Sequence, residues 1–95
     1  MKITLIQQNI IWADPKANTD EAERLIDSAP GSDLYILPEM FSTGFCTSPE
    51  GIAEPVEASS LEWMKECAGK RHCAIAGSIA VNDGGKYFNR FYFVK

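Results

Sequence analysis

The sequence predicts an α/β fold built on a mixed sheet, with the element order β-α-β-α-β-β. Short apolar runs alternate with two segments whose apolar residues recur at helical spacing. The last two strands are joined by Asn82-Asp83-Gly84-Gly85, a turn sequence typical of an antiparallel hairpin. A chain of 95 residues has room for one small domain, so we expect a single unit over residues 1–95.

Composition and charge argue against several classes of protein. Apolar residues make up 45% of the chain and charged residues 23%, as in ordinary globular proteins. The net charge of −4 argues against a nucleic-acid partner or an anionic membrane surface, because both favour clustered Lys and Arg. No apolar run approaches about 18 residues, so we expect no membrane-spanning helix.

Cysteine usage and the first residues of the chain predict a cytoplasmic protein. The chain has 3 cysteines, an odd number, and no CxxC motif, so no disulfide framework is expected. The apolar stretch that follows Lys2 is too short for a signal peptide and lacks a cleavage site.

The first strand is expected over residues 3–8, and the first helix follows a loop. Asp14 is a good N-cap, and Pro15 suits the first helical position. Pro30-Gly31 should end this helix. Asn18 falls on the apolar stripe of the helix, so we expect it to be buried and hydrogen-bonded to a loop backbone.

The second strand is expected over residues 33–37, and a long connection follows over residues 40–57. A connection of that length in a compact domain is usually functional or carries short structure of its own. Ser59 with Glu62 fits a capping box at the start of the second helix. Residues 73–81 form the expected third strand, whose small side chains allow another layer to pack closely.

The fourth strand is expected over residues 87–94 and carries aromatic residues on both faces. Tyr87, Phe91 and Phe93 share one face, while Phe88 and Tyr92 lie on the other. Aromatic residues on both faces imply neighbours on both sides, and two helices can hardly cover both faces of a sheet. We therefore expect a fragment, or a sheet that another chain covers.

Glu39 is the candidate for chemistry. It follows the apolar run 34–37 and Pro38, which has no N–H to give the sheet and should end the pairing there. A carboxylate at the carboxyl end of an interior strand lies where open α/β sheets bind ligands. In apolar surroundings it must be paired, hydrogen-bonded or protonated. The pattern alone leaves an acid/base group and a structural carboxylate about equally open.

Other polar residues have plainer interpretations. Glu50, Glu54 and Glu57 are expected in a solvated loop. Cys67, His72 and Cys73 fit no standard zinc spacing, and a fourth ligand is missing, so no metal site is expected there.

Residues 34–45 resemble the first catalytic block of the nitrilase, or carbon–nitrogen hydrolase, superfamily. Four further segments are similar to that superfamily: Gln7-Gln8-Asn9, the stretch from Trp12 to Asn18, Ala76-Gly77-Ser78, and Tyr87-Phe88-Asn89-Arg90. The combination looks most like the omega-amidase branch, which hydrolyses 2-oxoglutaramate and 2-oxosuccinamate to 2-oxo acids and ammonia.

The resemblance implies a layered α-β-β-α sandwich, of which residues 1–95 would be the N-terminal part of a single domain. It also implies a catalytic Glu, Lys and Cys. Glu39 matches the Glu, and the blocks that carry the Lys and the Cys would lie downstream. Phe41, Thr43 and Phe45 would line the substrate pocket, and neither a metal nor an organic cofactor would be needed. The partner would be a small-molecule amide, and the full-length protein would be a homodimer.

Two alternatives remain open. A metal-dependent phosphodiesterase or nuclease would use Asn9 and Glu39 at a magnesium site. Pro38 directly before the Glu and the acidic balance of the chain argue against it. The chain could also be a non-catalytic interaction fragment. With one of the three implied catalytic residues, it is expected to be inactive alone.

Overall fold

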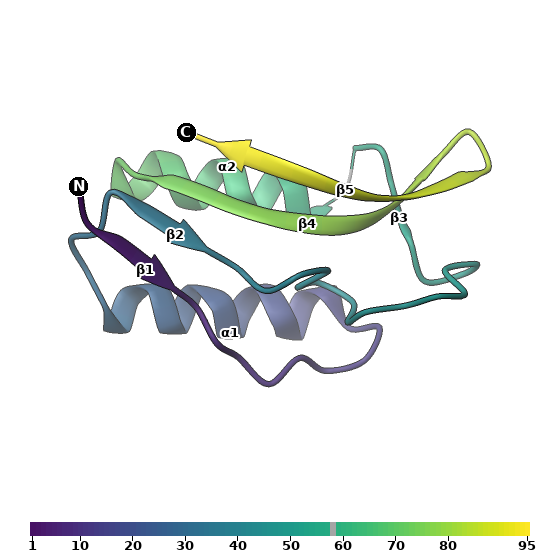
Figure 1. Ribbon diagram of the computed structural model, residues 1–95, viewed down its shortest axis with the longest axis horizontal. Helices are drawn as coiled ribbons and strands as arrows, with labels where there is room; N and C mark the ends of the chain where they lie inside the picture. The colour runs from purple at the N-terminus through teal and green to yellow at the C-terminus, as the bar shows by residue number, and fades with distance from the viewer. Residues whose placement is uncertain (58) are drawn as a thin grey trace.

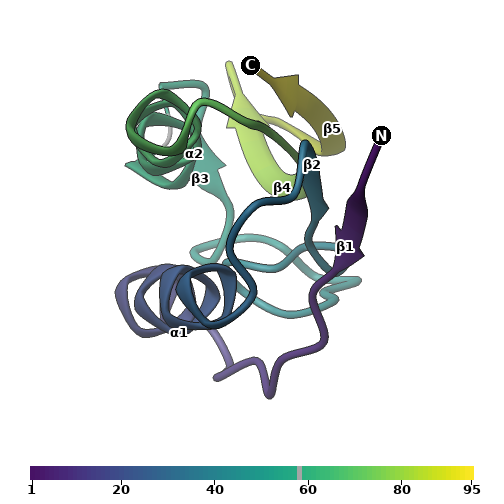
Figure 2. The same ribbon diagram turned by 90° about the vertical axis from the view of Figure 1, so that its left-hand side faces the viewer.

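The computed structural model describes residues 1–57 and 59–95, which form one five-stranded sheet with two helices (Figure 1). The elements in chain order are β1 (Ile3–Leu5), α1 (Pro15–Ser28), β2 (Leu34–Ile36), β3 (Glu54–Pro55), α2 (Ser59–Arg71), β4 (Ala74–Asp83) and β5 (Lys86–Val94). Both helices lie on the same side of the sheet (Figure 2). Neither of these two helices has the length and apolar character needed to cross a membrane.

Strand β4 is the centre of the sheet. Along one edge it pairs antiparallel with β5, from Ile75 opposite Val94 to Asp83 opposite Lys86. Its other edge is divided between two parallel partners: β2 pairs with residues 74–76, and β3 pairs with residues 81–82. Strand β1 pairs parallel with β2 and forms the outer edge. The sheet is therefore mixed, and the chain that follows β2 leaves the sheet in the gap between the two partners.

The predicted order of elements is confirmed, with one addition and two shortened strands. The second strand covers Leu34–Ile36 rather than residues 33–37. The two-residue strand β3 lies inside the connection over residues 40–57. The first strand ends at Leu5 rather than at residue 8. The residues that follow turn toward α1 instead, where the side-chain amide of Gln8 donates to the carbonyl of Asn18.

Asn18 is fully buried and hydrogen-bonded to loop backbone, as predicted. Its Oδ1 accepts from the N–H of Ile11 at 2.7 Å, and its Nδ2 donates to the carbonyls of Ile11 at 2.7 Å and Ser42 at 2.8 Å. The predicted cap of the same helix is present too, with Asp14 Oδ1 accepting from Ala17 N at 3.1 Å. Asn18 thus ties the loop after β1 to the loop after β2.

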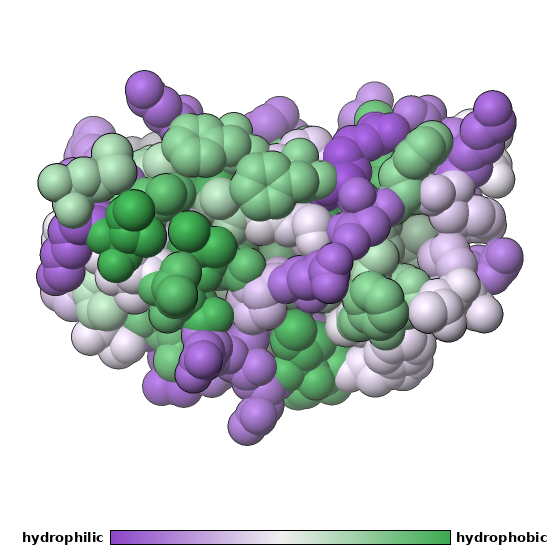
Figure 3. Space-filling view, in the orientation of Figure 1, coloured by the Kyte–Doolittle hydropathy of each residue, from purple (hydrophilic) through white to green (hydrophobic). Residues whose placement is uncertain are grey.

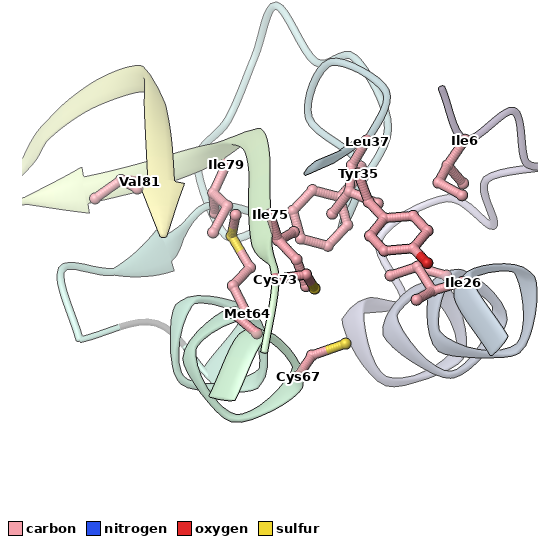
Figure 4. Packing of buried hydrophobic residues seen from close by; sticks show 13 residues of the cluster. Ile6, Ile26, Tyr35, Leu37, Met64, Cys67, Cys73, Ile75, Ile79 and Val81 are labelled. Carbon is pink, nitrogen blue, oxygen red and sulfur yellow. The ribbon is translucent and has the colours of Figure 1, made fainter. Parts of the chain in front are cut away.

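The main core lies between the sheet and the helices (Figure 4). Ile75 and Ile79 of β4 are fully buried against Met64 and Cys67 of α2, and Ile26 of α1 belongs to the same cluster. Residues of β4 alternate between the two faces of the sheet, so Ala74, Ala76 and Ser78 face the opposite side.

The face of the sheet opposite the helices is largely uncovered. We call it the open face. It carries the exposed apolar side chains Ile3, Leu5, Phe91 and Phe93, which are 51%, 70%, 64% and 58% exposed. Apolar side chains gather on the face of the molecule seen in Figure 3. Among the described residues, Met40, Cys46 and Ala53 cover the end of the open face near Ala80 and leave the rest of it uncovered. The described residues thus leave the aromatic side chains of β5 without a neighbouring layer on this side.

Candidate active site

Backbone contacts hold the segment around Glu39 against β4. Before it, the N–H of Leu37 donates to the carbonyl of Ala76 at 2.8 Å. After it, the N–H of Met40 donates to Ser78 Oγ at 2.9 Å. Met40 has a φ of 47°, an uncommon value for a residue other than glycine, and its carbonyl accepts from the N–H of Gly44 at 2.8 Å. Glu39 therefore sits at a sharp turn that is fixed on both sides.

Gly77 allows the same segment to approach β4 closely. A Cβ at this position would lie 3.1 Å from Cβ of Leu37 and 3.3 Å from Cδ1 of Phe41, which is too close for ordinary packing. The expectation that small residues on this strand permit close packing is confirmed here.

The carboxylate of Glu39 lines a shallow hollow on the sheet. Its Oε2 accepts a hydrogen bond of 2.8 Å from Nδ2 of Asn89 on β5. The hollow has a volume of about 320 Å³ and is lined by Leu37, Glu39, Gly77, Ser78, Asn89 and Phe91. Glu39 itself is exposed, so the apolar surroundings expected for this carboxylate are not found among the described residues. The physical reason is that the open face has no covering layer at this point.

The structure does not bring the three predicted pocket residues together with Glu39. Phe41 is fully buried on the helix side, with its ring centroid 5.8 Å from that of Trp63. Thr43 is fully buried and donates to the carbonyl of Gly44 at 3.0 Å. Phe45 is 63% exposed. None of these three side chains contributes to the hollow beside Glu39. The reason is that the chain changes direction at Met40, so the residues after it lie away from the hollow.

Asn9, the other residue of the magnesium alternative, is exposed and does not line this hollow. Within residues 1–57 and 59–95, no group of three or more His, Cys, Asp and Glu side chains is arranged to hold a metal ion.

Glu54 is a buried carboxylate that sequence reasoning placed in a solvated loop. Its two oxygens accept from Ser42 Oγ at 2.6 Å, Ser60 Oγ at 2.7 Å and Ser60 N at 3.1 Å. Glu50 and Glu57 are exposed, as expected. The prediction of a solvated position was wrong for Glu54 because this residue lies in β3, next to the first turn of α2. Its hydrogen bonds hold the loop after Glu39 to that helix.

Burial makes Cys67 and Cys73 poor nucleophiles. Cys46, Cys67 and Cys73 are all buried and unpaired. Burial raises the pKa of Cys67 to about 11 and also raises the pKa of Cys73. A thiol is nucleophilic as the thiolate, and a raised pKa keeps it protonated at neutral pH.

We expect iodoacetamide to label Cys67 in the folded chain far more slowly than in the chain unfolded in urea. The reason is that its thiolate forms in quantity only as the pH rises toward about 11, and that the sulfur is only 1% exposed. Peptide mass spectrometry after timed labelling at neutral pH measures both rates. Rapid labelling of Cys67 in the folded chain would contradict the structure.

The fold and the sequence together match a known protein family. A profile of the carbon-nitrogen hydrolase family matches residues 2–95, so the chain belongs to the carbon-nitrogen hydrolase family. The family match confirms the predicted membership and does not favour the nuclease alternative.

Its relatives include omega-amidases. Omega-amidase YafV of Yersinia enterocolitica is 35% identical over 95 residues, which cover 100% of this chain and 37% of that protein. Omega-amidase YafV of Escherichia coli strain K12 is 34% identical with the same coverage. A nitrilase of Pyrococcus abyssi is 31% identical over 96 residues, covering 94% of this chain and 37% of the relative.

A solved structure shares the fold. The crystal structure of XC1258 from Xanthomonas campestris, a CN-hydrolase superfamily protein with an arsenic adduct in its active site, superimposes with a TM-score of 0.90. The two sequences are 33% identical, and the match covers 99% of this chain and 36% of that one. The predicted α/β fold is confirmed, and the chain spans little more than a third of the length of the relatives it matches.

Proposed function

We propose that this chain is the N-terminal part of an omega-amidase-like enzyme and that Glu39 is the acid/base group of its active site. The observation that carries the proposal is the placement of Glu39. Its carboxylate follows a parallel strand, on a turn fixed to β4, and lines a hollow on the open face. The match to omega-amidases over the whole of the chain supports the same function.

In the proposed reaction, Glu39 takes the proton from a cysteine thiol supplied by the rest of the enzyme. The thiolate then attacks the amide carbon, and a lysine cation stabilises the negative charge that forms on the amide oxygen. Glu39 returns the proton to the leaving nitrogen, so that ammonia departs as the C–N bond breaks. Water then attacks the acyl-enzyme, which releases the carboxylic acid and restores the thiol.

The substrate class in this proposal is the monoamide of a 2-oxo dicarboxylic acid. The lysine and the cysteine are part of the longer enzyme, and residues 1–95 alone are inactive because proton transfer without a nucleophile cannot cleave an amide. A cytoplasmic location and assembly of the longer enzyme as a homodimer belong to the same proposal. The three unpaired cysteines support a reducing compartment.

Ammonia release from 2-oxoglutaramate tests the proposal. We expect turnover by the longer protein that contains this chain and none by residues 1–95 alone. Glutamine, which has the same amide but no 2-oxo group, is the matched control substrate and should react more slowly.

Two results would overturn this assignment. One is a longer protein without the Lys and Cys blocks. The other is a longer protein that cleaves no amide but hydrolyses a phosphodiester with a strict need for magnesium.

A further inference from the structure

Asn89 lies on the opposite side of β4 from the strand that leads to Glu39. It stands across from Ala80 in the antiparallel ladder of β4 and β5, which runs without interruption from Ile75 to Asp83. The register of this ladder fixes the position of Asn89 along the strand direction relative to β4. Its side chain lies on the open face and lines the same hollow as Glu39.

The hydrogen bond between these two residues has a defined direction. An ionised carboxylate can only accept, so the amide nitrogen of Asn89 must be the atom that faces it. Nδ2 of Asn89 donates to Oε2 of Glu39 at 2.8 Å. Within the described residues, the Glu39 side chain makes no other hydrogen bond. Its second oxygen, Oε1, therefore has no side-chain donor among them.

We infer that Asn89 is a positioning residue that holds the Glu39 carboxylate so that Oε1 is the oxygen which exchanges protons. This inference rests on the proposed function. The backbone of Glu39 is already fixed by the contacts of Leu37 and Met40. The three side-chain torsions of Glu39 are not fixed by those contacts, and a second contact at the carboxylate removes that freedom.

A neutral amide suits this role better than a charged partner. A Lys or Arg in the same place would strongly favour the ionised form of the carboxylate and weaken it as a base. An amide orients the carboxylate without adding a charge, and it stays a donor at every pH at which the protein is folded.

Kinetics of the longer enzyme test the inference. Asn89→Leu has nearly the same shape but no donor, and we expect kcat to fall on the order of 10²-fold with KM nearly unchanged. Asn89→Gln keeps the amide donor and should recover part of the lost kcat. Tyr87→Phe changes a neighbouring side chain on the same face of β5 and should leave both constants unchanged.

A spectroscopic measurement separates positioning from folding. In the same protein labelled with ¹⁵N-asparagine, the side-chain amide signal of Asn89 should shift with pH as Glu39 ionises. The shift should vanish in Glu39→Gln. An Asn89 signal that ignores this substitution would overturn the inference, as would an unchanged kcat in Asn89→Leu.

The two proposals can fail separately. If Glu39→Gln leaves turnover intact, the proposed function of Glu39 falls. If Glu39→Gln abolishes turnover and Asn89→Leu keeps full kcat, the function stands and only the positioning role is lost.

Discussion

Glu39→Gln should lower the kcat of the longer enzyme by about 10²–10⁴-fold and leave the protein folded. Glutamine has the shape of glutamate but cannot take or return a proton, so both the activation of the thiol and the departure of ammonia are slowed. Glu39 is exposed, and an amide oxygen at the same place can still accept from Asn89, so the free energy of unfolding should change little. Ammonia release and urea denaturation measure the two effects.

The matched control is Glu50→Gln, which removes the same charge from an exposed position in the connection after Glu39. Its kcat should equal that of the unchanged protein. Equal losses in the two variants would mean that net charge, and not proton transfer, governs the reaction.

Glu54→Ala should lower the free energy of unfolding by about 2–5 kcal/mol. The substitution leaves the hydroxyls of Ser42 and Ser60 and the N–H of Ser60 buried without their acceptor. Each unsatisfied buried group costs about 1–3 kcal/mol. The substitution also removes the cost of burying the carboxylate itself, which offsets part of that sum. Urea denaturation followed by tryptophan fluorescence measures the change.

Two further variants complete this experiment. Glu54→Gln keeps one acceptor oxygen and should cost less than Glu54→Ala. Glu57→Ala, at an exposed position three residues away, should have no measurable effect. A Glu54→Ala protein as stable as Glu57→Ala would show that the hydrogen bonds of Glu54 contribute nothing to folding.

Local patterns in the sequence predicted the elements and the position of Glu39. Apolar spacing, together with Pro38 after the second apolar run, located the strand end and the carboxylate that follows it. Asn18 was predictable because a polar residue on an apolar helix stripe must find a partner. These signals act over a few residues and are therefore visible in one sequence.

The partners of the two important carboxylates were not predictable. Glu54 looks like one of three acidic residues in a loop, and its burial depends on serines at positions 42 and 60. Asn89 and Glu39 are 50 positions apart in the sequence. They meet because of the register between β4 and β5, which no local sequence pattern encodes. Phe41 and Phe45 lie in a loop whose apolar residues have no helical or strand spacing. The sequence pattern therefore did not predict which of the two side chains faces the core.

The divided edge of β4 has a consequence for where the chain can tolerate change. The turn that carries Glu39 is held within the gap, from residue 37 to residue 46, while the chain from residue 47 to β3 crosses the surface before it rejoins the sheet. Substitutions or insertions in that outer stretch leave the anchored turn untouched. We expect changes in sequence and length to be tolerated in that outer stretch, while the turn that carries Glu39 keeps its geometry.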